Sequence, residues 1–265
     1  MAVPSYPLAR PPVGTDVHSL PVEKVSQAIL FSQLRAAELM EPGGTLIPVR
    51  LIPDFIHGGW RVRWEFGTIG SVPGPLRQVF PELERVHQAQ CEPLAWARVS
   101  VNKDRGLLDV ALELPSPELA VPWNSLVDGT RLLPQGGRLP ATLTGENRQM
   151  LGQVDGVDVW VEGEVVGQLE YVPLEDGALG VRVFVVDGES FIDIGVGDVA
   201  PVPVLPERVV VEEAPAPPAP ASPASPALSP QAPWDVTVPG EELAEPNPTG
   251  PRRVLSPVVA SDSAD

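Results

Sequence analysis

The chain has few of the residues from which cross-links and reaction centres are built. Its 265 residues include three His and one Cys, Cys91. A single Cys excludes an internal disulfide and a cysteine-rich zinc site, and it fits a reducing compartment. Neither the Gly-x-Ser-x-Gly motif of serine hydrolases nor the Gly-Lys-Ser/Thr motif of phosphate-binding loops occurs. We therefore expect no enzymatic activity, no cofactor and no metal site.

Long hydrophobic runs are also missing. The sequence contains no stretch of about 18 uncharged apolar residues, which is the length needed to cross a bilayer. The first residues do not combine a basic start with an apolar block, as a secretory signal does. We expect a cytoplasmic protein with no membrane partner, and the large excess of Arg over Lys hints at a bacterial, GC-rich genome.

Basic residues are outnumbered, with 18 Lys+Arg against 35 Asp+Glu, and the imbalance is uneven along the chain. Residues 1–120 hold 11 basic and 13 acidic side chains, whereas residues 121–205 hold 4 and 13. Phosphate backbones are bound largely through Lys and Arg, so any nucleic-acid role belongs to the first 120 residues. The acidic part is interpreted either as a solvated surface or as a surface for a basic protein partner.

Proline is concentrated at the C-terminal end, with 14 Pro between Pro206 and Asp265. Such a composition favours solvated polyproline II and predicts a disordered tail over residues 205–265. Two short segments with apolar residues follow, one at Trp234 and one beside Arg252 and Arg253. They are either parts of a passive tail or docking motifs that order on a partner.

The first 44 residues are predicted to form an arm with one amphipathic helix. Ser19 and Pro21 are typical of a helix start, and Pro42-Gly-Gly is typical of a stop. Between them the apolar residues recur at three- and four-residue spacing, which predicts a helix over residues 21–40. Its apolar face could pack on the neighbouring domain or on another subunit.

From residue 46 to residue 200 the apolar pattern changes to a period of two, which is typical of half-buried strands. The clearest example is residues 60–66, and a helical stretch over residues 74–87 is broken by Pro81. We predict a mainly β, α+β fold of two small antiparallel barrel-like units. The predicted strands are residues 46–52, 60–66, 69–72, 94–101, 107–114, 139–143, 157–161, 165–172, 179–186 and 190–196.

The two units, residues 45–120 and 121–204, resemble one another in sequence. Residues 64–72 align with residues 160–169 through Trp-x-x-Gly and a second Gly, with one insertion. A later alignment matches Arg98-Val-Ser-Val with Arg182-Val-Phe-Val. The sequence thus indicates either a degenerate duplication or a chance match in a chain rich in Gly and Val.

The first unit also resembles a known family. Gly67-Thr-Ile-Gly-Ser-Val-Pro73, followed by a helix and a strand pair, is similar to the Gly-x-x-Ile-Gly-x-Leu-Pro core of HIRAN domains. The resemblance covers residues 46–115 and implies a small β-barrel, which in the best-known members binds single-stranded DNA ends. The family's Arg-Glu-Pro and Asn-x-x-Asp stretch has no counterpart in residues 54–60, so DNA binding is kept only as an alternative.

Candidate binding residues lie on the strand at 60–66. Its alternation places Arg61 and Arg63 on one face, where Arg98 of a neighbouring strand could join them. Trp60 and Trp64 point to the opposite face, where burial in the core is favoured over base stacking. No third group that could orient a nucleophile is recognisable beside Cys91 and its neighbour in sequence, His87.

These observations favour an intracellular adaptor that has no catalytic residues and binds a protein partner. The predicted binding residues are Arg61, Arg63, Arg98, Trp234, Arg252 and Arg253. The alternative is a nucleic-acid-associated module that binds single-stranded DNA through residues 45–120.

Overall fold

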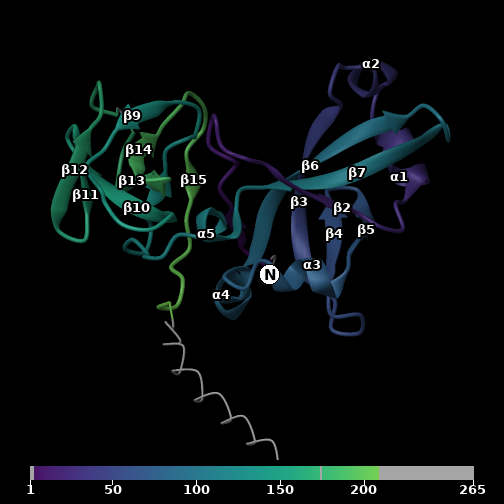
Figure 1. The fold of residues 1–265 in the computed structure, drawn as a ribbon, viewed down its shortest axis with the longest axis horizontal. Coiled ribbons are helices and arrows are strands. Elements are labelled where there is room, and N and C mark those ends of the chain that lie inside the picture. Colours follow the sequence, from purple (N-terminus) through teal and green to yellow (C-terminus); the bar gives the residue numbers. More distant parts are fainter. Residues whose placement is uncertain (1–2, 174, 209–265) are drawn as a thin grey trace, which may run out of the picture. The chain divides into compact units, whose positions relative to one another are not determined.

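Strands dominate the structure, as the period-two pattern predicts. They form two antiparallel sheets of seven and eight strands, each with one parallel pair, and only short helices connect them (Figure 1). The computed structural model describes residues 3–173 and 175–208, all within one unit that spans Met1–Val211. The mainly β prediction is confirmed, whereas the predicted motifs at Trp234, Arg252 and Arg253 lie outside the described residues. None of the described helices has the length and apolar character needed to cross a membrane.

The first sheet has the order β2-β7-β6-β3-β4-β5, and β1 pairs in parallel with β6. Residues that alternate along these strands bury one apolar face, where Val49, Val62 and Ala97 are fully buried. Residues 1–44, which were expected to be an arm, supply the first two strands. The strands are β1 (Ser5–Pro7), β2 (His18–Pro21), β3 (Thr45–Pro53), β4 (Trp60–Trp64), β5 (Gly67–Val72), β6 (Glu92–Asn102) and β7 (Leu107–Leu114).

The helix predicted over residues 21–40 is wrong in its extent. Two short helices occur instead, α1 (Gln27–Gln33) and α2 (Ala36–Leu39), separated by the extended and buried Leu34. Pro21 pairs with β7, so it belongs to a strand rather than to a first helical turn. Pairing with β7 therefore outweighs the amphipathic pattern at the start of the predicted helix.

The helical stretch between β5 and β6 breaks near Pro81, as predicted. It forms α3 (Gly74–Gln78) and α4 (Leu83–Gln88), and Pro81 lies in the turn between them. Val86 and Leu83, which are 0% and 1% exposed, pack α4 against the core of the first sheet. A further short helix, α5 (Pro117–Ala120), follows β7 and starts the connection to the second sheet.

The second sheet has the order β12-β11-β10-β13-β14-β9, and β8 pairs in parallel with β13 and antiparallel with β15. Its core contains the fully buried Val159, Val181, Val183 and Ile192. The strands are β8 (Arg131–Leu132), β9 (Arg138–Pro140), β10 (Arg148–Asp155), β11 (Asp158–Val161), β12 (Glu164–Gln168), β13 (Leu179–Val186), β14 (Glu189–Asp193) and β15 (Ala200–Pro201).

The central strand β10 was not predicted from the sequence. Its residues Gln149 to Gly152 are all buried, and a polar Gln stands among them. A strand buried on both faces does not show the alternation of polar and apolar residues by which half-buried strands are recognised.

The two sheets have the same topology. In each, a three-stranded meander, β3-β4-β5 or β10-β11-β12, precedes a hairpin, β6-β7 or β13-β14, and the meander's first strand pairs with the hairpin's first strand. The preceding strands also correspond, because β1 and β8 pair in parallel with β6 and β13, and β2 and β9 pair with β7 and β14. Both meanders have a register shift at the same place, after Val62 in β4 and after Val159 in β11. The sequence alignment of residues 64–72 with residues 160–169 places β4-β5 on β11-β12, but it is off by one residue before its insertion: in the two ladders Trp64 is equivalent to Val161, not to Trp160.

Each sheet is closed by a glycine in the last strand of its meander. Gly70 pairs with Val62, and Gly167 pairs with Val159, so the two glycines are equivalent. A Cβ on Gly70 would lie 2.6 Å from the Glu23 carbonyl oxygen, in the segment whose backbone bonds Ser71 and closes the sheet. A Cβ on Gly167 would lie 2.8 Å from the tip of the Ile192 side chain and 3.0 Å from the Pro140 carbonyl oxygen. The absence of a side chain permits the close approach that closure requires.

We predict that Gly70→Ala destabilises the protein by roughly 2 kcal/mol, because the new methyl group would displace the backbone at Glu23. Gly167→Ala should cost less, because its nearest backbone atom would lie at 3.0 Å rather than 2.6 Å and its closest contact is the end of the flexible Ile192 side chain. The measurement is denaturant unfolding monitored by circular dichroism. Thr68→Ala, at an exposed position of β5, is the matched control and should change stability by less than about 0.5 kcal/mol. Equal stabilities of Gly70→Ala and Thr68→Ala would contradict the closure argument.

Candidate functional site

The strand β4 presents two cations on the outer face of the first sheet. Its burial alternates residue by residue, and Trp60 and Trp64 are 1% and 8% exposed whereas Arg61 and Arg63 are exposed. The Trp rings therefore belong to the core, as the alternation predicts. Both guanidinium groups point away from the core, and neither forms an ion pair within the described residues.

Arg98 does not join this pair, in contrast to the expectation from sequence. It lies on β6, and the whole of β3 separates β6 from β4. Its guanidinium donates to both carboxylate oxygens of Glu113 and, at 2.8 Å, to the carbonyl oxygen of Gly43. Arg98 is thus neutralised within the first sheet.

Arg50 of β3 takes the place that we had assigned to Arg98. It stands directly opposite Arg63 in the β3-β4 ladder, and its guanidinium lies 3.6 Å from Glu92. Like charges directly opposite one another in a sheet are destabilising. We call Arg50, Arg61 and Arg63 the basic face. Sequence alternation places Arg50, the only charged residue of β3, on the outer face, but only the strand order sets it beside β4.

An apolar tip stands next to the basic face, in the loop between β3 and β4. Phe55 and Ile56 are 89% and 87% exposed, although large apolar side chains are usually at least partly buried. We call these two residues the apolar tip. Neither residue was among the predicted binding residues, although an apolar pair between Asp54 and a Gly-Gly turn was a visible signal.

The loop that carries the apolar tip is held in one conformation by hydrogen bonds. The Asp54 carboxylate accepts from the backbone N–H groups of Ile56 and His57 at 3.1 and 3.4 Å, and it lies 2.9 Å from the His57 ring. Hydrogen bonding to His57 holds the pKa of Asp54 below its usual value. Arg77 donates to the Gly59 carbonyl oxygen at 3.2 Å and ties the end of the loop to α3. The apolar tip is therefore presented by an ordered turn.

Two hollows flank the basic face. One, of about 440 Å³, has Arg61, Lys24 and His57 in its lining. The other, of about 400 Å³, has Arg50 and Arg63 in its lining. The strand predicted over residues 60–66 ends at Trp64, and Phe66 is 49% exposed. Charged and exposed apolar side chains thus lie next to one another around β3 and β4.

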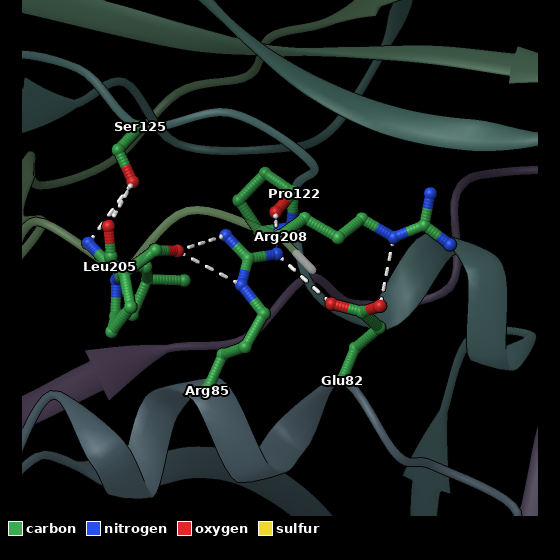
Figure 2. Close-up of polar contacts among 7 residues, drawn as sticks. Glu82, Arg85, Pro122, Ser125, Leu205 and Arg208 are labelled. Carbon is green, nitrogen blue, oxygen red and sulfur yellow. Dashed lines mark hydrogen bonds and ion pairs between the residues drawn. The ribbon is translucent and has the colours of Figure 1, made fainter. Parts of the chain in front are cut away.

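A second polar site joins the last described residues to α4 (Figure 2). Arg85 is buried and donates to the carbonyl oxygens of Pro206, at 2.8 and 3.1 Å, and of Pro122, at 3.0 Å. It also donates to Glu82 at 3.0 Å, and Arg208 donates to the other Glu82 oxygen at 2.9 Å. We call this network the clasp. It satisfies a buried guanidinium with several acceptors, which is the condition under which a buried charge is tolerated.

The clasp extends to the connection between the sheets. The Ser125 hydroxyl donates to the Leu205 carbonyl oxygen at 3.2 Å and accepts from its N–H group at 3.0 Å, as Figure 2 shows. Arg208 also stacks on Trp123, with its guanidinium carbon 3.9 Å from the ring centroid. Leu205, where we expected the tail to begin, is 4% exposed. The clasp therefore anchors the chain up to the end of its described part.

Cys91 and His87 do not form an activated pair. The Cys91 thiol is buried and donates to the Ala89 carbonyl oxygen at 3.4 Å, and burial raises its pKa. Burial also lowers the pKa of His87, which keeps its ring neutral. A raised thiol pKa is unfavourable for a nucleophile. In the part of the chain that the structure describes, no group of His, Cys, Asp and Glu is suited to a metal ion.

Comparison with known proteins gives no relative for this chain. No family model, no curated protein and no solved structure matches it. The function is therefore inferred from the basic face, the apolar tip and the clasp.

We expect Arg85→Met to destabilise the protein by about 3 kcal/mol, because it leaves Glu82 and two carbonyl oxygens without their shared donor. Arg105→Ala, which removes an exposed partner of Asp109, is the control and should cost less than about 1 kcal/mol. Unfolding free energies from urea titration provide the comparison. Equal losses in the two variants would show that the clasp does not anchor residues 205–208.

Glu82 should make stability depend on pH. Burial raises the pKa of Glu82, but the hydrogen bonds from Arg208 and Arg85 outweigh it, so the pKa lies below its ordinary value of 4.5. Its contribution is complete above pH 4.5 and is lost as the pH falls through the lowered pKa. Between neutral pH and about pH 3, Glu82→Gln should therefore lose less stability than the wild type does. Glu41→Gln, at an exposed site, should follow the wild type, and a Glu82→Gln curve parallel to both would refute the prediction.

Proposed function

We propose that this chain is a non-enzymatic adaptor, and that its basic face holds an acidic segment of a protein partner. The observation that carries the proposal is the direct opposition of Arg50 and Arg63 in the β3-β4 ladder, beside Arg61. Glu92, 3.6 Å from Arg50, offsets part of the repulsion, but neither Arg61 nor Arg63 forms an ion pair within the described residues, so the arrangement costs stability in the free protein. A bound carboxylate would relieve that repulsion, because guanidinium groups bind carboxylates through two parallel hydrogen bonds.

The apolar tip indicates that the partner segment also contains apolar residues. Phe55 and Ile56 lie on the loop that joins β3 to β4, the two strands of the basic face. An ordered loop loses little conformational entropy when it is covered, so its apolar side chains contribute to affinity at low cost. We therefore expect a segment in which acidic residues stand next to apolar ones.

The overall charge limits the strength of this interaction. The chain has a formal net charge of -17, so an acidic partner is repelled at long range and attracted only close to the basic face. The favourable contacts are local, and salt screens the long-range repulsion more than the contacts themselves. Affinity should consequently fall less with added salt than it does for proteins that bind polyanions.

A protein segment is favoured over single-stranded nucleic acid because of where the aromatic rings lie. Proteins that bind single strands stack bases on exposed aromatic side chains. Trp60 and Trp64 are 1% and 8% exposed, and the exposed Phe55 and Phe66 lie before and after β4, so these rings form no continuous stacking surface along the basic face. Single-stranded DNA binding through residues 45–120 remains the alternative, and it is an outcome of the same experiment.

The test is fluorescence anisotropy of the full chain with two labelled probes, a peptide of alternating Asp, Leu, Glu and Phe and an oligothymidylate of similar length. We expect the peptide to bind and Arg61→Ala/Arg63→Ala to weaken it at least about tenfold, because charge-assisted hydrogen bonds are lost. Arg35→Ala/Arg105→Ala removes the same charge at other exposed positions and should have little effect. Tighter binding of the oligothymidylate, or equal losses in the two double variants, would overturn the proposal.

A further inference from the structure

The outer face that is basic in the first sheet has an acidic and aromatic counterpart in the second. Val62 and Val159 are equivalent, because each pairs with the closing glycine of its sheet. Arg63 therefore corresponds to Trp160, since each follows its Val, and Trp160 lies on the same outer face of β11. The same topology thus presents cations in one copy and an indole ring in the other.

Trp160 forms part of a groove of about 440 Å³. The groove lies where the connection after α5 passes the outer face of β10 and β11. Asn124 holds this connection in place, because its side chain donates to the Leu151 carbonyl oxygen at 2.8 Å and accepts from the Leu151 N–H at 2.7 Å. Apolar groups of Leu126 and Leu151 line the groove beside the ring, and Trp160 is 37% exposed. The indole is therefore partly exposed in a groove one wall of which is held in place by Asn124.

Two carboxylates also line the groove. Asp155 ends β10 and Glu162 lies in the turn after β11, and both are exposed. Neither forms an ion pair or a side-chain hydrogen bond within the described ranges, whereas Arg131 and Glu175 of the same unit pair at 2.9 Å. The unit between residues 121 and 205 holds 13 acidic and 4 basic side chains, so a cation is also attracted at long range.

We propose that this groove binds an Arg or Lys side chain from a basic segment of a protein partner. An indole face is the best aromatic acceptor for a cation, and the two carboxylates are placed to take the hydrogen bonds of a guanidinium or ammonium group. The partly buried Leu126 suits the apolar stem of such a side chain, whereas Leu151 is 1% exposed and belongs to the core. The site is independent of the basic face, because it lies on the other sheet and takes a ligand of the opposite charge.

The test follows the indole N–H signal of Trp160 by NMR while a tetra-arginine peptide is added to the full chain. The signal is assigned by its absence in Trp160→Leu, which keeps an apolar side chain and so protects the fold. We expect a saturable shift of this signal, and Trp160→Leu should bind at least about threefold more weakly by calorimetry. A tetraglutamate peptide should leave the signal unchanged.

Matched charge variants distinguish a site from a diffuse acidic surface. Asp155→Asn/Glu162→Gln should weaken tetra-arginine binding about fivefold. Glu146→Gln/Glu189→Gln removes the same charge from exposed positions elsewhere in the unit and should weaken it at most about twofold. Equal effects of the two double variants, or an unmoved Trp160 signal, would overturn the proposal. Loss of binding to the acidic probe of the basic face would not affect this result, so the two proposals fail separately.

Discussion

The close approach of two backbones at Gly70, and again at Gly167, is the constraint on which both sheets depend. At each glycine the segment that follows an early strand meets the last strand of the meander, with the Glu23 and Thr142 N–H groups bonding to Ser71 and Val166. Closure satisfies the backbone groups of the edge strands, which would otherwise be exposed to pairing with another chain. It also fixes the curvature of the meanders, and thereby the direction in which their outer side chains point.

Because both sheets share this frame, the difference between their surfaces comes from side chains alone. Equivalent positions on β4 and β11 carry Arg63 and Trp160, and the residue opposite is Arg50 in the first sheet and Gln153 in the second, where Asp155 ends the same strand. A fold that holds the backbone constant while the outer residues change can present two surfaces of opposite charge on one chain. Two such surfaces would suit the adaptor role that we propose, since each would select a partner segment that the other repels.

The clasp holds the last described residues against α4 and against the connection between the two sheets. Arg85 takes acceptors from two distant segments, at Pro122 and at Pro206, while Glu82 binds Arg208. The guanidinium is buried and fully engaged, so its removal would leave several polar groups unsatisfied. The last described residues, 205–208, are therefore held in place by hydrogen bonds to Arg85, Ser125 and Glu82.

Much of the fold was predictable from local patterns. The alternation at residues 60–64 determined that Arg61 and Arg63 face outward and that Trp60 and Trp64 are buried, because strand geometry places neighbours on opposite faces. The strand β10, the break at Leu34 and the neighbours of β4 were not predictable in this way. Each depends on which segment supplies the partner backbone, and that choice is made by contacts between residues far apart in sequence. Only the tertiary structure could therefore replace Arg98 by Arg50, bring Arg85 to Pro206 and set Trp160 beside Asn124, since local periodicity carries no information about strand order.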